Sequence, residues 1–136
     1  MEKYSLKEDI KVFYVKAESF PEGITVAHEK LHSMLPSKEG RHFFGISYPD
    51  QNYQIIYRAA VKESYPGEAE KYGCDTFVIR KGEYISETIH GWQKDVPGIA
   101  KTFEKLLSNP HIDRKGYCLE EYLGENDMRC MVGLSN

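Results

Sequence analysis

The chain has 136 residues, which is long enough for one domain with a hydrophobic core or for two small modules that share one. Its 40% hydrophobic and 29% charged residues are typical of a globular protein and exclude a disordered one. The net charge of −3 and the scattered Lys and Arg residues argue against nucleic acid as a direct partner, because phosphate binding needs a concentrated basic surface.

The first residues, MEKYSLKEDI, contain no apolar signal segment, and the chain has no run of about 18 apolar residues. We therefore expect a cytoplasmic protein with no membrane partner. The three cysteines, Cys74, Cys118 and Cys130, are widely spaced, which favours reduced thiols. Ten tyrosines, six phenylalanines and one tryptophan suit a cavity that needs flat apolar walls and hydroxyl groups.

In chain order, the first half predicts a strand, a helix and two further strands. Residues 10–17 are rich in β-branched and aromatic side chains, which is typical of a strand. After the FPEG turn, apolar residues between 27 and 35 recur at helical spacing until Pro36 ends the helix. Residues 41–48 and 52–61 predict the two following strands.

The second half predicts the same order. Residues 63–73 are polar and contain Pro and Gly, which predicts a linker. Residues 76–91 predict strand structure interrupted by a Lys-Gly pair, and residues 96–110 predict a second amphipathic helix. Residues 115–123 and 128–134 predict two strands joined by the turn sequence GEND.

Both halves thus predict the order strand–helix–strand–strand. The sequence HEKLHS at 28–33 also resembles FEKLLS, which lies 75 residues later, and together these observations favour an internal duplication. We expect one α+β domain whose first repeat spans about residues 10–62 and whose second spans about 74–135. Each repeat would form an antiparallel sheet with a helix on one face, and a cleft would form at the uncovered faces or at the seam.

The pattern His28-Glu29-x-x-His32 matches a zinc-hydrolase motif, in which two histidines one helical turn apart bind Zn²⁺ and the glutamate is the general base. We consider this the weaker hypothesis. Lys30 adds a positive charge beside the metal, and a catalytic zinc needs a third ligand, for which neither His111 nor His90 lies in a recognisable context. We therefore expect no metal and no cofactor, with both histidines of the motif flanking the apolar stripe of their helix.

The strand CLEEYL offers a more informative carboxylate. Its side chains alternate between two faces, with these two sets: Cys118, Glu120 and Tyr122, and Leu119, Glu121 and Leu123. The leucines predict that the helix covers the second set, so that Glu120 and Tyr122 face the other way. A carboxylate among aromatic neighbours favours a cationic or hydrogen-bond-donating ligand, because a buried charge without a partner is costly. The alternative is a solvated Glu120, or one paired with Arg129 or Arg58.

The segments IRKGEYISETIHGW (79–92) and YCLEEYLGENDMRCMVGL (117–134) resemble the GyrI-like family of effector-binding domains. Related domains are the ligand-binding halves of multidrug-sensing transcription regulators. The resemblance rests on three pairs in order, namely Gly82 with Tyr84, His90 with Gly91, and Glu120 with Tyr122. With YRAAVKE (57–63) as the closing strand of the first unit, it covers nearly the whole chain.

This resemblance implies two SH2-like β-α-β-β units around a pseudo-twofold axis, with a ligand cleft between them. It implies that Glu120 is the glutamate of the pocket. Glu121 stands where the family usually has an apolar residue, and a slip of one residue would turn it toward the cleft instead. Trp92 would hold an aromatic cation beside the carboxylate by stacking and cation–π attraction. The expected ligand-binding residues are Glu120, Tyr122, Trp92, Tyr84, His90, Tyr57 and Phe44.

The first function hypothesis is a stand-alone small-molecule-binding protein for lipophilic, aromatic or cationic ligands. It would sequester its ligands, sense them with a protein partner, or act on another protein as the family's gyrase-inhibiting relative does. No helix-turn-helix segment precedes the domain, so we expect no complete DNA-binding regulator. The resemblance also implies an alternative, a hydrolase of cyclopropane-type genotoxic natural products. There Glu120 would be the general base, and Tyr84 or Tyr122 would bond the substrate.

Overall fold

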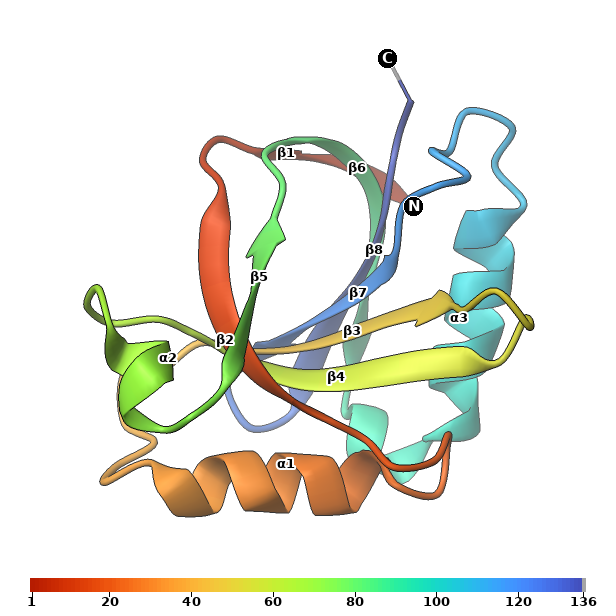
Figure 1. The fold of residues 1–136 in the computed structure, drawn as a ribbon. Coiled ribbons are helices and arrows are strands. Elements are labelled where there is room, and N and C mark those ends of the chain that lie inside the picture. Colours follow the sequence, from red (N-terminus) through yellow and green to blue (C-terminus); the bar gives the residue numbers. More distant parts are fainter. Residues whose placement is uncertain (136) are drawn as a thin grey trace. The chain divides into compact units, whose positions relative to one another are not determined.

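The computed structural model describes residues 1–135 (Figure 1). Helices combine with antiparallel strands, which agrees with the expected α+β class. The chain divides into two compact units. We call Asp9–Ile79 the N-unit, and Met1–Glu8 together with residues 80–135 the C-unit.

The N-unit contains a four-stranded antiparallel sheet with one long helix on one face. Its elements are β2 (Ile10–Lys16), α1 (Ile24–Met34), β3 (Phe43–Pro49), β4 (Ile55–Lys62), α2 (Glu68–Lys71) and β5 (Asp75–Ile79). The strand order is β3-β4-β2-β5. Figure 1 shows α1 running alongside β4, and the helix packs against β4 and β2.

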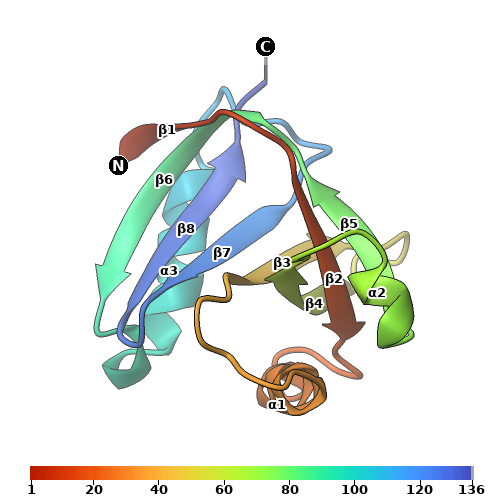
Figure 2. The same ribbon diagram turned by 90° about the vertical axis from the view of Figure 1, so that its left-hand side faces the viewer.

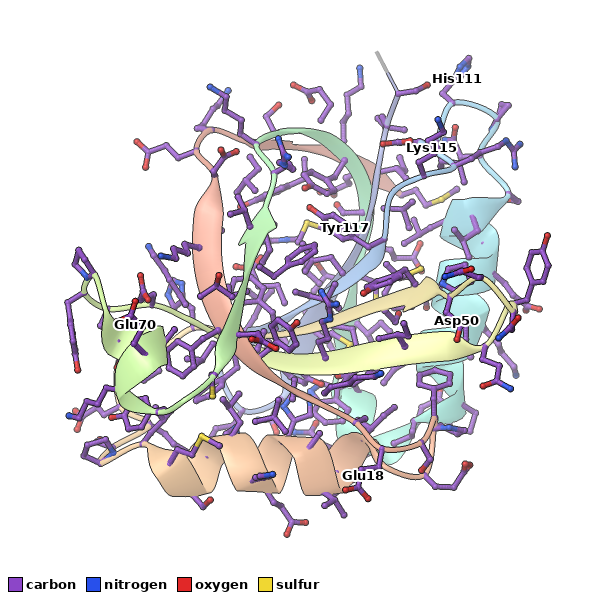
Figure 3. All side chains as sticks on the ribbon, in the orientation of Figure 1. Glu18, Asp50, Glu70, His111, Lys115 and Tyr117 are labelled. Carbon is purple, nitrogen blue, oxygen red and sulfur yellow. The ribbon has the colours of Figure 1, made fainter. Side chains whose placement is uncertain are left out.

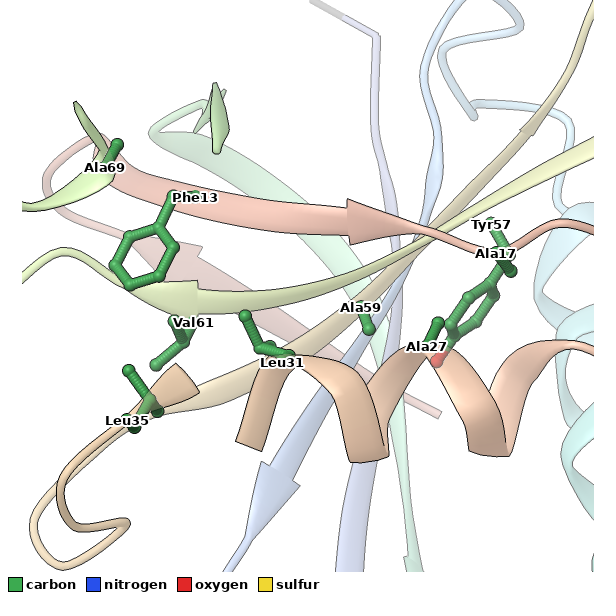
Figure 4. Close-up of a cluster of buried hydrophobic side chains, with 9 residues drawn as sticks. All are labelled: Phe13, Ala17, Ala27, Leu31, Leu35, Tyr57, Ala59, Val61 and Ala69. Carbon is green, nitrogen blue, oxygen red and sulfur yellow. The ribbon is translucent and has the colours of Figure 1, made fainter. Parts of the chain in front are cut away.

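Alternation along β2 and β4 turns an apolar face toward α1. Ala27 and Leu31, one helical turn apart, meet Phe13 from β2 and Tyr57 and Val61 from β4 (Figure 4). Leu31, Phe13 and Val61 are completely buried. Full burial of such a side chain contributes about 1.5–3 kcal/mol to the stability of the fold. The apolar residues at helical spacing between 27 and 35 therefore stabilise the packing of α1 on the sheet.

The C-unit repeats this arrangement. Its elements are β1 (Glu2–Leu6), β6 (Gly82–His90), the 3-10 helix η1 (Trp92–Lys94), α3 (Pro97–Leu107), β7 (Cys118–Leu123) and β8 (Asp127–Gly133). The strand order is β1-β6-β8-β7, and α3 packs against β8 and β6 (Figure 2). Leu106 of α3 meets Met128, Cys130 and Val132 of β8 in the core of this unit.

Each unit therefore has the predicted strand–helix–strand–strand order, while β1, α2 and η1 were not predicted. The expected linker at 63–73 contains α2, and the boundary between the units falls between Ile79 and Arg80. It falls there because β5 pairs with β2. The duplication, the twofold axis and the cleft between the units stay predictions. Within residues 1–135, no helix is long and apolar enough to cross a membrane.

A buried ion pair holds α2 to the rest of the N-unit. Glu68 is 2% exposed, and its two carboxylate oxygens accept hydrogen bonds from Arg41 Nη1 at 2.9 Å and Nη2 at 3.0 Å. The Ser64 N–H donates a third bond, at 2.8 Å. Burial alone would raise the pKa of Glu68, but these bonds and the charges of Arg41 and Lys71 outweigh it and lower the pKa below its ordinary value.

We predict that Glu68→Gln lowers the free energy of unfolding at pH 7 by about 1.5–3 kcal/mol, the range for a charge-assisted hydrogen bond. Glu70→Gln, on the exposed side of the same helix (Figure 3), should have little effect. Because folding lowers the pKa of Glu68, its contribution is complete above the unfolded pKa and is lost as pH falls through the folded one. In urea unfolding, the difference in the free energy of unfolding between the wild type and Glu68→Gln should therefore become smaller as the pH is lowered. An equal loss for Glu70→Gln would contradict this role.

Candidate functional site

Pairing with β8 determines which face of β7 each side chain occupies. Glu120 lies directly opposite Cys130, and Tyr122 lies opposite Met128. Cys130 and Met128 are completely buried in the cluster that contains Leu106 of α3. Direct cross-strand partners share a face of the sheet, so Glu120 and Tyr122 lie on the face that α3 covers.

The prediction that Glu120 faces away from the helix is therefore wrong. The leucines do not mark the helix-covered face, because both faces of β7 bury apolar residues: Tyr122 packs on the α3 side, and Leu119 is 1% exposed on the other. Glu121 is the residue that faces away from α3. It also makes the ion pair considered for Glu120, since its Oε1 accepts a hydrogen bond from Arg129 Nη1 at 2.6 Å.

Three predicted site residues, Trp92, Tyr122 and Glu120, meet on this helix-covered face, and we call them the Trp–Tyr–Glu cluster. The Tyr122 hydroxyl donates a hydrogen bond to Glu120 Oε1 at 3.1 Å. The Trp92 and Tyr122 ring centroids are 5.6 Å apart, with the rings edge to face at 66°. Trp92 Nε1 is buried and has no hydrogen-bond partner among residues 1–135.

The His90-Gly91 step places Trp92 in this cluster. Gly91 adopts φ 64°, a left-handed conformation that glycine enters at little cost. Its N–H donates to the Asn126 carbonyl at 2.7 Å, which ties the end of β6 to the β7–β8 turn. The chain thereby turns out of β6 into η1, and Trp92 packs against the core shared with Phe103 of α3.

Negative charge lies on the same face of the sheet. Glu87 of β6 and Glu120 of β7 are both directly opposite Cys130 of β8. Burial, followed by the charges of these two glutamates, raises the pKa of the Cys130 thiol to about 12, so this thiol stays protonated. Lys105 of α3 pairs with Glu87 at 2.8 Å. A carboxylate beside aromatic rings suits a cationic ligand.

Two other predicted residues of the C-unit lie elsewhere. Tyr84 is 4% exposed on the face away from α3, where its hydroxyl donates to the Arg80 carbonyl at 2.5 Å and lies 3.0 Å from the Tyr117 hydroxyl. Figure 3 labels Tyr117 just before β7. The His90 side chain is 80% exposed, with Nδ1 3.2 Å from Asp127 Oδ1. The structure does not bring these two residues to the cluster.

Tyr57 and Phe44 belong to the N-unit. Tyr57 is 2% exposed on the α1 face, with its hydroxyl 2.9 Å from His28 Nε2. Phe44 is 1% exposed and pairs with Ala60, on the face away from α1. Their expected part in ligand binding stays a prediction. Phe103 of α3 also packs beside the cluster, and its place on the apolar stripe of the amphipathic helix at 96–110 is the sequence signal that could have indicated this.

The two histidines of the zinc-like motif, on α1, contact side chains of the sheet. The Nε2 atom of His28 is engaged by the Tyr57 hydroxyl, and the His32 ring packs against Phe43 with centroids 4.5 Å apart. Glu29 is exposed. In the part of the chain that the structure describes, no three His, Cys, Asp or Glu side chains gather as metal ligands. The zinc hypothesis thus has no third ligand among these residues.

Comparison with family models gives no match, and comparison with curated proteins gives none either. Solved structures do show the same fold. An integron cassette protein of Vibrio cholerae has a TM-score of 0.70 at 12% identity, over 98% of this chain and 95% of its own. The protein SAV2435, bound to tetraphenylphosphonium, has a TM-score of 0.65 at 9% identity, over 100% and 95%. A protein of Staphylococcus aureus MU50, provisionally ascribed to transcription regulation, has 0.60 at 10%, over 99% and 97%.

We predict that His28 makes the fold sensitive to mild acid. Burial first, and then the charge of His32, lowers the pKa of His28 to about 4. The folded state thus favours neutral His28, and the stability this contributes is complete above the unfolded pKa of about 6.5 and is lost as pH falls toward the folded one.

Between these two pH values, the free energy of unfolding should fall by up to about 1.4 kcal/mol per pH unit more in the wild type than in His28→Gln. Urea unfolding at several pH values measures this. His42→Gln, at an exposed position, is the control and should keep the wild-type slope. Identical slopes for the wild type and His28→Gln would contradict the prediction.

Proposed function

We propose that the chain is a small-molecule-binding protein that holds lipophilic aromatic cations at the Trp–Tyr–Glu cluster. One observation carries the proposal: the Glu120 carboxylate accepts a hydrogen bond from Tyr122, whose ring contacts the indole of Trp92. A negative group and two flat π surfaces thus lie within one small region of the helix-covered face.

The physical fit is to a ligand that combines delocalised positive charge with aromatic surface. Each ring that meets a cation contributes about 0.5–2 kcal/mol, with the larger values where water is excluded. Glu120 is half-buried, and in such surroundings its attraction for a cation exceeds that of a fully solvated carboxylate. The ligand's apolar area would add burial against the side chains that pack around Leu106.

Two of the similar structures support this choice. SAV2435 is bound to tetraphenylphosphonium, a cation surrounded by four phenyl groups, and the Staphylococcus aureus protein is ascribed to transcription regulation. At these identities the likeness concerns the fold, so the ligand class comes to this chain as part of the proposal. We also propose that the protein senses this ligand and transmits the signal to a regulatory protein partner.

The experiment is a titration with tetraphenylphosphonium, followed through the fluorescence of Trp92, the single tryptophan of the chain. We expect saturable binding to the wild type. Glu120→Gln should weaken binding at least tenfold, or about 1.4 kcal/mol, because the charge that attracts the cation is lost. Glu121→Gln is the matched control, since it removes the same charge from the same strand on the opposite face and should bind like the wild type.

A neutral ligand of similar shape, triphenylphosphine oxide, separates charge from apolar contact. It should bind the wild type more weakly than the cation and should not distinguish Glu120→Gln from the wild type. Equal affinity of tetraphenylphosphonium for the wild type and Glu120→Gln would contradict the role of the carboxylate. A loss in Glu121→Gln as large as that in Glu120→Gln would contradict the location of the site.

A further inference from the structure

Two arginines occupy corresponding places in the two units. Arg58 follows the helix-facing Tyr57 on β4, and Arg129 follows the helix-facing Met128 on β8. Both therefore lie on the face of their own sheet that is turned away from the helix. Both also lie over aromatic rings, although only one of them has a carboxylate partner.

At this position in the C-unit, a carboxylate neutralises the charge of Arg129. Its cross-strand partner on β7 is Glu121, and the two side chains form the ion pair at 2.6 Å. On its other flank, Cζ lies 4.4 Å from the centroid of the Tyr4 ring. The guanidinium charge is thus matched by a carboxylate that the neighbouring strand supplies.

Arg58 has no such partner. The position corresponding to Glu121 is Ile46, which lies directly opposite Arg58 on β3 and is completely buried. On β2 the residue opposite Arg58 is Lys16, a second cation, and like charges at such positions repel each other. Among residues 1–135, neither Arg58 nor Lys16 makes an ion pair, and Arg58 Nε is buried with no hydrogen-bond partner.

Aromatic rings surround the Arg58 guanidinium. Its Cζ lies 4.4 Å from the ring centroid of Tyr14, 5.0 Å from that of Tyr48 and 5.5 Å from that of Phe77. Ring faces attract the charge but accept none of the five in-plane N–H donors, which call for an oxygen acceptor. A planar guanidinium matches the two oxygens of a carboxylate bidentately.

We propose that Arg58 and Lys16, with the rings of Tyr14, Tyr48 and Phe77, form a binding site for a small aromatic carboxylate. The ligand's carboxylate takes the role toward Arg58 that Glu121 has toward Arg129, and it offsets the repulsion between Arg58 and Lys16. Its aromatic body packs against the surrounding rings. This site uses none of the residues of the Trp–Tyr–Glu cluster, and it takes a ligand of opposite charge.

The test is a titration of ¹⁵N-labelled protein with benzoate, in which NMR follows the side-chain Nε–H signals of Arg58 and Arg129. We expect a saturable shift for Arg58 and little change for Arg129. Ile46→Glu gives Arg58 an internal carboxylate and should weaken benzoate binding at least tenfold, or about 1.4 kcal/mol. Arg58→Gln should do the same without placing a charge at a buried position, and circular dichroism verifies that each variant is folded.

The reciprocal variant, Glu121→Ile, removes the internal carboxylate of the C-unit, and Arg129 should then respond to benzoate. Acetate and inorganic phosphate test the aromatic part, and each should bind several times more weakly than benzoate. Acetate or phosphate binding as tightly as benzoate would overturn the assignment of an aromatic ligand. An Arg58 signal that no anion shifts, or unchanged benzoate binding by folded Arg58→Gln, would overturn the site.

Discussion

The packing of α3 against β8 determines how the side chains of the C-unit sheet are arranged. Leu106 meets Met128, Cys130 and Val132, which alternate along β8 and so define one apolar face. Antiparallel pairing transmits this choice to β6 and β7 residue by residue. Because α3 packs on one face of β8, the strand pairing determines the face on which each side chain of β6 and β7 lies.

Two adjacent glutamates acquire different roles from this constraint. Glu120 faces α3, accepts a hydrogen bond from Tyr122, and belongs to the proposed cation site. Glu121 faces the other way and neutralises Arg129. The N-unit has the same strand order but an isoleucine, Ile46, in place of this second carboxylate, and Arg58 is left for an external anion in our proposal. In this proposal, the residue at one strand position, Glu121 or Ile46, decides whether the arginine opposite it is paired internally or binds a ligand.

The sequence predicted the order of the main elements because apolar spacing records which side of each element is buried. It did not predict the face of Glu120, because Leu119 and Tyr122 are both apolar and bury opposite faces, and only the packing of α3 separates them. The family resemblance selected Glu120 and Tyr122, and the aromatic positions added Trp92; in the structure Tyr122 contacts both of the others. The aromatic surroundings of Arg58 depend on pairing between strands far apart in sequence, which no local pattern indicates.

Nuclear Overhauser effects between side-chain protons report which face of β7 is covered by α3. We expect contacts from the Tyr122 ring to the Trp92 indole and to the Met128 methyl group, and none from the Leu123 methyl groups to the Phe103 ring. The opposite pattern, in which Leu123 contacts Phe103 and Tyr122 contacts neither Trp92 nor Met128, would show that Leu123 and not Tyr122 lies on the helix-covered face. That result would place Glu121 on the helix-covered face and remove the basis for the proposed cation site.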